Sequence, residues 1–347
     1  MASLSETDIS PLCLPVLVIF SEQWFMLCVT DLKSEITLQY PGRIGRISLD
    51  RKKELIMSQR TKGILCIIAS AFCFALMNTF VRLSGDLPSF QKSFFRNLVA
   101  FFVALFILLK EHHGFQLKKD CIPFHLLRSS LGTIGILCNF YAIDHLTLSN
   151  ASMLNKMSPF FVLIFSYFIL KEKLTAAQVA IVAAAFAGAL FIIKPTPTNL
   201  ELIPSLIGLA GGMCAGFAYT MVRAMGLRGE RGSLIVFFFS GFSCLSVLPL
   251  LMAGYVPMTT EQLVMLLGAG LSAAGGQFGI TKAYTYAPAK EVSVYDYSQI
   301  IFSALLGFFI FNQLPDAWSF VGYVLIIGAA LVMFFYNNRH HEPKNAQ

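Results

Sequence analysis

The chain has 347 residues, of which 56% are hydrophobic and only 13% are charged. A soluble domain carries about 25% charged residues, so the composition excludes a protein whose whole surface faces water. The net charge of +7 suggests a nucleic-acid ligand, but the basic residues form no stripe along one element, which excludes that class. They occupy short gaps between long apolar runs instead, as in a polytopic membrane protein.

The first 57 residues differ from the rest of the chain. An apolar stretch at about 11–29 is interrupted by Glu22, and a polar, basic segment follows it. The basic start and small-residue cleavage site of a secretory signal peptide are both missing. Met57 resembles a natural start, so we expect residues 1–57 to be an N-terminal extension outside the fold. Whether this extension also crosses the membrane is left open.

Ten apolar runs follow the extension, each of about 18 or more residues and therefore long enough to cross a bilayer. Proline residues fall mostly in the gaps, where they are tolerated. Pro159 is the exception, and it predicts a kink in the fourth run. The predicted spans are approximately 63–83, 89–109, 123–145, 149–170, 175–193, 203–225, 232–253, 260–286, 290–311 and 316–336.

The orientation is predicted from lysine and arginine, which gather in alternate gaps, whereas the other gaps contain only Lys194. Cytoplasmic loops carry the excess of basic residues, so both ends of the ten-helix core are predicted to be cytoplasmic, with residues 337–347 as a tail. We expect a multi-pass protein of the plasma (inner) membrane.

The chain repeats itself at an offset of 140–141 residues. Cys73 and Arg82 recur as Cys214 and Arg223, for example, and the similarity continues through the whole half. The two units, 60–194 and 203–336, hold five spans each. Five is odd, so the second unit enters the membrane from the opposite side. The predicted fold is therefore an all-α integral membrane protein of two inverted five-helix repeats, an arrangement typical of secondary transporters.

Four segments carry a resemblance to a known family: SFQKSFFRNLVA (89–100), HLLRSSLG (125–132), ILKEKLTAAQ (169–178) and IFNQLPDAWS (310–319). Across residues 60–336 the chain resembles the ten-helix EamA-type carriers of the drug/metabolite transporter superfamily. The resemblance implies transport of small metabolites such as amino acids, nucleotide-related compounds or drugs. It also implies a central cavity lined by spans 1, 3, 4, 6, 8 and 9. The FFR and LLR elements resemble those of members that take up S-adenosylmethionine.

Several basic residues lie inside the spans, where a charge is costly. Arg96 is interpreted either as a contact for an anion or as a structural residue bonded to carbonyls or headgroups, and its depth favours the structural interpretation. Lys92, Arg82 and Arg128 lie nearer to span ends and are predicted to be interfacial, with snorkelling stems.

Two acid–base pairs are predicted as outer and inner gates, Asp144 with Lys156 and Lys282 with Asp296. Counting helical rise from the span ends places Lys156 and Asp296 about 10 Å apart in depth, which argues against a direct bridge between them. The alternative is that both pairs are static and only neutralise buried charge. Asp296 is also a candidate for binding a coupling proton.

Neutral polar residues inside the spans are predicted to line the substrate cavity, because amides and phenols bind zwitterionic or amide-bearing solutes at low desolvation cost. The alternative for each is a hydrogen bond between helices. The candidates are Asn78, Asn139, Asn155, Tyr219, Gln277, Tyr295 and Gln299.

The sequence favours a secondary carrier that moves an amino acid or related solute by alternating access. Uptake or exchange of a nucleotide-related metabolite such as S-adenosylmethionine is the alternative. A membrane-embedded enzyme is disfavoured because no catalytic or metal-ligand motif occurs in the spans, and a channel is disfavoured by the fused repeat. Catalytic residues, cofactor and metal are all expected to be absent. The predicted partners are a small-molecule substrate and the lipid bilayer, and a homodimer is left open.

Overall fold

The computed structural model describes residues 49–111, 115, 117–169, 171, 174–194, 200–286 and 293–339, which contain helices and no strand. The first half comprises α2 (Leu49–Leu83), α3 (Ser89–Glu111), η2 (Lys119–Cys121), α4 (Ile122–His145), α5 (Leu148–Asn155), α6 (Ser158–Ile169) and α7 (Ala176–Ile193). The second half comprises α8 (Leu202–Leu227), α9 (Gly232–Gly254), α10 (Thr260–Tyr286), η3 (Ser293–Tyr297), α12 (Ser298–Phe311) and α13 (Ala317–Arg339).

The predicted all-α membrane fold is confirmed. Within the described residues, nine helical segments are long and apolar enough to cross a membrane, and a shorter apolar segment, Tyr295–Phe311, lies at the ninth predicted span. Helix α2 begins at Leu49, so residues 49–57 of the predicted extension continue the first helix. Residues 1–48, like His112, His113, His340 and His341, lie outside the described part of the chain.

The fourth span is broken near its middle. Helix α5 ends at Asn155, Lys156 and Met157 form a turn, and α6 begins at Ser158. Pro159 therefore lies in the first turn of a new helix, where its missing N–H has no partner to lose. The ninth span is irregular at the equivalent place, because the 3₁₀ helix η3 precedes α12. Both irregular segments bring backbone and polar side chains to the middle of the protein.

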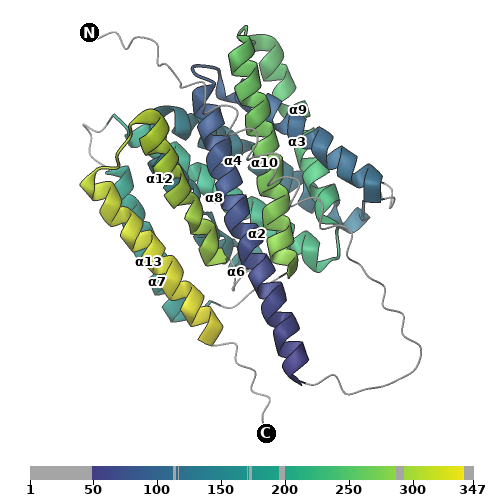
Figure 1. Cartoon of the computed structure of the whole chain (residues 1–347), viewed down its shortest axis with the longest axis vertical. Helices are drawn as coiled ribbons and strands as arrows, with labels where there is room; N and C mark the ends of the chain where they lie inside the picture. Colours follow the sequence, from purple (N-terminus) through teal and green to yellow (C-terminus); the bar gives the residue numbers. More distant parts are fainter. Residues whose placement is uncertain are drawn as a thin grey trace.

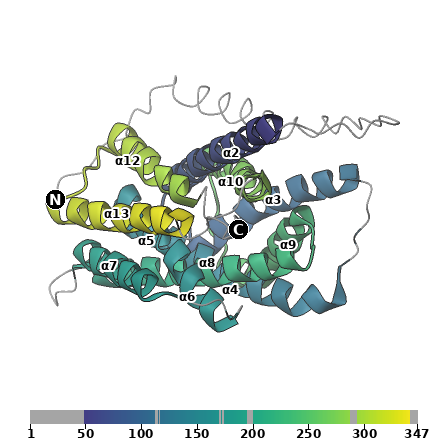
Figure 2. The same ribbon diagram turned by 90° about the horizontal axis from the view of Figure 1, so that it is seen from below.

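The helices of the two halves pack in a pattern that the inverted repeat requires. Helix α2 packs on α10 and α4 on α8, so the first helix of each half pairs with the third of the other. The remaining helices pair with their own equivalents: α3 with α9, α5 with α12, and α7 with α13. Figure 1 shows α2 running between α12 and α10, and Figure 2 shows the α2–α10 and α4–α8 pairs on opposite sides of the molecule.

The repeat extends to backbone detail at the ends of the fourth and ninth spans. Lys171 and Asn312, which are 141 positions apart, both adopt left-handed backbone conformations, with φ of 55° and 51°. A residue in this conformation commonly terminates a helix. The same left-handed conformation therefore follows the equivalent helix in each half.

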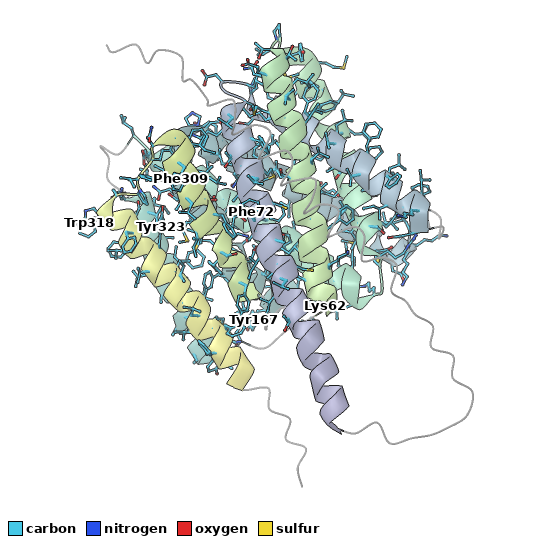
Figure 3. The ribbon with its side chains drawn as sticks, in the orientation of Figure 1. Lys62, Phe72, Tyr167, Phe309, Trp318 and Tyr323 are labelled. Atoms are coloured by element: carbon cyan, nitrogen blue, oxygen red, sulfur yellow. The ribbon has the colours of Figure 1, made fainter. Side chains whose placement is uncertain are left out.

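Large apolar side chains cover the outer surface while smaller ones allow the helices to approach. Phe309 on α12 is 75% exposed and Trp318 on α13 is 62% exposed, and both project from the edge of the bundle (Figure 3). Inside, a Cβ added at Gly212 on α8 would lie 2.6 Å from the carbonyl oxygen of Leu154, so only glycine permits this approach. Packing is thus the structural role of this glycine.

Candidate functional site

A cavity lies at the centre of the bundle, between the two halves. Six of the seven neutral polar residues predicted to line a cavity do line it: Asn78, Asn139, Asn155, Tyr219, Gln277 and Gln299. Its free volume is about 80 Å³, which holds only a few water molecules. Pockets for drug-sized ligands measure about 300–1,000 Å³, so the cavity is smaller than a pocket for such a ligand.

Tyr295, the seventh candidate, is not among the cavity-lining residues. Its ring packs edge-on against Phe334, with centroids 6.3 Å apart, and beside the buried pair Ile67 and Ala283. Tyr295 belongs to η3, whose other residues Asp296 and Tyr297 are buried. Tyr295 and Gln299 are four residues apart but do not share the face of one α-helix, because η3 is a 3₁₀ helix and α12 begins only at Ser298.

One face of α4 forms the longest wall of the cavity. Arg128, Gly132, Gly135 and Asn139 all line it, at steps of four, three and four residues that keep them on one side of a helix. At 1.5 Å per residue this wall is about 16 Å long. It has a guanidinium at one end and an amide at the other.

Arg128 is buried within this wall and is only 4% exposed. Its guanidinium carbon lies 3.9 Å from the centroid of the Phe239 ring, a cation–π contact. A Cβ at Gly132 would lie 2.3 Å from Arg128 Nη1, so glycine one turn later provides the space for the guanidinium. Arg128 Nε has no hydrogen-bond acceptor among the described residues. The prediction that Arg128 is interfacial is therefore wrong.

Arg96 on α3 lines the same cavity and is 2% exposed. Its Nη1 donates to Asn97 Oδ1 at 2.5 Å, and the Asn97 amide donates to Ser243 Oγ at 2.8 Å, which ties the group to α9. Arg96 Nε has no acceptor in the described part of the protein. Arg96 and Arg128 both line the cavity, so two cations face the same space.

Lys156 and Asp296 form a buried ion pair, although their predicted difference in depth argued against one. Lys156 Nζ donates to Asp296 Oδ2 at 2.5 Å, joining the break in the fourth span to η3. The depth estimate failed because it assumed unbroken helices and ignored the reach of a lysine stem. Lys156 lines the cavity, and Asp296 Oδ1 is buried without a hydrogen-bond donor from the described residues.

The predicted gate pairs are therefore wrong in their pairing. Asp144 accepts from Lys92 Nζ at 2.6 Å, not from Lys156, and Lys92 is fully buried rather than interfacial. Asp296 pairs with Lys156 and not with Lys282. Arg82 donates to the carbonyl oxygens of Ile143 and Leu146 at 2.9 and 2.5 Å, and this contact ties α2 to the end of α4.

The neutral residues of the cavity are partly engaged in bonds between helices. Asn78 Nδ2 donates to Ser152 Oγ at 3.4 Å, and Ser152 donates to Ser303 at 2.8 Å, so α2, α5 and α12 are linked. The side-chain oxygens of Asn78 and Asn139, however, are buried and accept no bond from the described residues. The two alternatives predicted for these amides, helix linkage and cavity lining, are thus both realised in Asn78.

The charged residues of this site, named here the cavity cluster, are Arg96, Arg128, Lys156 and Asp296. The two guanidiniums contribute +2, and Lys156 and Asp296 cancel each other. No carboxylate is among the described residues that line the cavity itself. A buried, uncompensated positive charge is costly unless an anion neutralises it, so the cavity is built to attract negative groups.

A profile of the EamA-like transporter family matches two segments of the chain, residues 61–194 and 202–335. The chain belongs to the EamA-like transporter family. Each matched segment corresponds to one five-helix half of the structure, so the family and the fold agree on the internal repeat.

Several curated EamA-like relatives are similar over nearly their full lengths. The pseudopaline exporter CntI of Pseudomonas aeruginosa (strain UCBPP-PA14) is 31% identical over 80% of this chain and 98% of its own. An S-adenosylmethionine uptake transporter of Rickettsia prowazekii is 26% identical over 82% and 96%. A riboflavin transporter of Brucella anthropi is 25% identical over 77% and 96%. This EamA-like protein is therefore a small-metabolite transporter and not an enzyme.

A solved crystal structure with 16% sequence identity superimposes with a TM-score of 0.60, over 81% of this chain and 99% of the other. That likeness supports the EamA-like fold alone. Within the described residues, no group of three His, Cys, Asp or Glu side chains is placed to hold a metal ion.

Sequence reasoning considered Arg96 as an anion contact but favoured a structural role for it, and it missed Arg128 in this EamA-like cavity because it judged that residue by its distance from a span end. One signal was present for Arg128: the glycine at position 132, one helical turn later, provides the space that a buried guanidinium needs. No comparable signal marks Arg96, whose neighbours Ser93 and Asn97 are common polar residues of helix ends.

Proposed function

We propose that this protein is a secondary carrier that moves an amino acid or a related carboxylate-bearing metabolite across the plasma (inner) membrane by alternating access. The substrate carboxylate binds between Arg96 and Arg128, and the amides of Asn78 and Asn139 accept hydrogen bonds from the rest of the molecule. The two ends of the α4 wall thus recognise different groups of one substrate.

The observation that carries the proposal is the pair of buried guanidiniums, which have no carboxylate partner among the described residues. Arginine presents a planar fork of donors that matches a carboxylate, and it stays charged at any physiological pH. Arg96 is held by Asn97, and Arg128 by the Phe239 ring, so both are positioned before a ligand arrives. Their Nε donors lack acceptors among the described residues, which is the pattern of a site that waits for an anion.

Alternating access is supported by the inverted repeat and by contacts between the two halves on both sides of the bundle. On one side, Lys194 of the first half pairs with Asp316 of the second at 2.8 Å. On the other, Lys118 Nζ donates to the carbonyl oxygens of Arg228 and Gly229 at 2.6 and 3.0 Å. An inverted repeat gives two related conformations, one open to each side of the membrane, and we expect one of these sets of contacts to break in each.

S-adenosylmethionine is the second candidate, favoured by the Rickettsia relative that is named for its uptake. Its sulfonium and ammonium groups outweigh its single carboxylate, so it carries a net positive charge. The cavity cluster has a net positive charge as well. Electrostatics therefore place this solute behind an amino acid or an organic anion.

The test is counterflow in proteoliposomes. Vesicles with purified, folded protein are loaded with one unlabelled solute and mixed with the same solute in radiolabelled form, over a panel of amino acids, their N-substituted derivatives and S-adenosylmethionine. Saturable accumulation of a carboxylate-bearing solute supports the proposal. Counterflow of S-adenosylmethionine alone would favour the second candidate, and passage without counterflow would indicate a channel.

A further inference from the structure

We propose that the substrate carries two anionic groups, most simply two carboxylates, and that the charge balance of the cavity cluster selects it. This inference rests on the proposed function and deepens it, because it specifies how many negative charges the solute brings. It follows from counting which buried cations are already neutralised and which are not.

Three cationic side chains line the cavity: Arg96, Arg128 and Lys156. Among the described residues, Lys156 alone of the three has an acidic partner, since its Nζ lies 2.5 Å from Asp296 Oδ2. Arg96 and Arg128 form no ion pair with a described carboxylate. The described residues of the cavity cluster therefore carry an excess of two positive charges, and one carboxylate would leave half of this excess in place.

The two guanidiniums are also held separately, which suits two anionic groups better than one. Arg96 is tied through Asn97 to Ser243 on α9, whereas Arg128 rests on the Phe239 ring and fits over Gly132 on its own helix. Each has a buried Nε without an acceptor among the described residues. Two cations that line one cavity gain most when each receives its own carboxylate.

Asp296 determines how many cations of the cavity cluster lack an acidic partner. Although it is 7% exposed and does not line the cavity itself, it removes Lys156 from the set of uncompensated cations. Neutralising Asp296 would leave Lys156 as a third cavity-lining cation without an acidic partner among the described residues, and neutralising Lys156 would lower the net charge of the cavity cluster to +1.

The experiment measures substrate preference in counterflow with matched pairs that differ by one carboxylate: glutamate and glutamine, aspartate and asparagine, and N-carboxymethyl-alanine and alanine. Each member competes against the labelled solute that gives counterflow. In the unaltered protein we expect the dicarboxylate of at least one pair to compete about 30-fold better or more, as the loss of one buried charge pair implies. Equal competition within all three pairs would overturn the inference.

Four variants then change the charge by known steps. Arg128→Gln and Lys156→Gln each lower the excess to +1, and both should reduce the preference to within about 3-fold. Asp296→Asn raises the excess and should retain or increase the preference. The double variant Lys156→Gln with Asp296→Asn returns the excess to +2, so it should recover the preference that Lys156→Gln alone has lost.

The double variant separates charge count from loss of a local contact, because it lacks the ion pair but has the original net charge. A preference that stays lost in this variant, in protein that still exchanges the labelled solute, would contradict the inference. Absence of counterflow for every solute in folded, unaltered protein is a different outcome, since it would contradict the proposed function itself.

Discussion

Two clusters of charged residues lie in the same bundle, and they differ in how many of their polar atoms have hydrogen-bond partners. In the first cluster, Lys92 forms an ion pair with Asp144, and Arg82 donates to two backbone carbonyl oxygens of the first half. In the cavity cluster, the Nε donors of Arg96 and Arg128 and the Oδ1 of Asp296 have no partners among the described residues. Lys92 is as deeply buried as Arg96 and Arg128, although Arg82 and Asp144 are only partly buried. Lys92 differs from the two cavity arginines in having an acidic partner among the described residues, so the presence of such a partner, and not burial alone, separates structural charges from candidate functional ones.

The strongest test of this contrast is Arg128→Gln against Arg82→Gln. We expect Arg128→Gln to lower exchange by about 100-fold or more, as for one partner of a buried charge pair, while the melting temperature stays the same or rises because an unpaired cation is removed. Arg82→Gln should instead destabilise the fold by about 1–3 kcal/mol, since two carbonyl groups lose their donor. Counterflow and thermal unfolding in detergent measure both. If Arg82→Gln abolished exchange in well-folded protein, the contrast would fail.

A smaller effect is expected from crowding Arg128 without removing it. In Gly132→Ala the new methyl would lie 2.3 Å from Arg128 Nη1, so the guanidinium must move, and exchange should fall by about 10-fold for a shift of this size. Gly226→Ala is the matched control, because nothing lies within 4 Å of a Cβ there. The ratio of the two exchange rates, at equal amounts of folded protein, is the measurement. Equal rates would show that the position of the guanidinium is unimportant.

Substitutions at Lys92 and Asp144 should change the stability of the protein and not its exchange activity. Asp144→Asn leaves the buried Lys92 ammonium without its counter-charge and should cost about 3 kcal/mol or more, whereas Lys92→Met combined with Asp144→Leu should recover most of this loss. Thermal unfolding of the single and double variants forms the test. A double variant as unstable as Asp144→Asn would show that the pair itself, and not its charge balance, matters.

The smallest effect is expected at the exposed pair Lys194–Asp316. Burial would raise the pKa of Asp316, but hydrogen bonds from Lys194 and Ser319 outweigh it and hold the pKa below its ordinary value. Its contribution to stability is therefore complete at neutral pH and is lost only as the pH falls below about 4. Because Asp316 is 43% exposed, Lys194→Ala should lower the melting temperature by about 2 °C or less at pH 7. A much larger fall in the melting temperature would contradict the expectation that this exposed ion pair contributes little to stability.

The sequence predicted the helices well because a bilayer leaves few alternatives: each span must be long, apolar and helical. Cavity-lining residues such as Asn139 and Gln299 were found for the same reason, since a polar group in a span must face protein. The ion pair between Lys156 and Asp296 was missed because it depends on where the fourth span breaks. Pro159 indicates the break in the sequence, but it does not show how far the break shifts Lys156 relative to Asp296. Whether Arg96 and Arg128 have hydrogen-bond or ion-pair partners could not be predicted either, because their neighbours come from other helices.

The excess charge of the cavity has a consequence for a membrane under voltage. Moving one elementary charge through 100 mV changes the free energy by about 2.3 kcal/mol. If the proposed solute places its two carboxylates on Arg96 and Arg128, both guanidiniums are neutralised locally, and the membrane potential acts on the loaded carrier only through any remaining charge of the solute, such as an ammonium group. The empty carrier keeps both charges and must work with or against the field whenever they move. Voltage would then act on the return of the empty protein, and would determine how readily exchange becomes net transport.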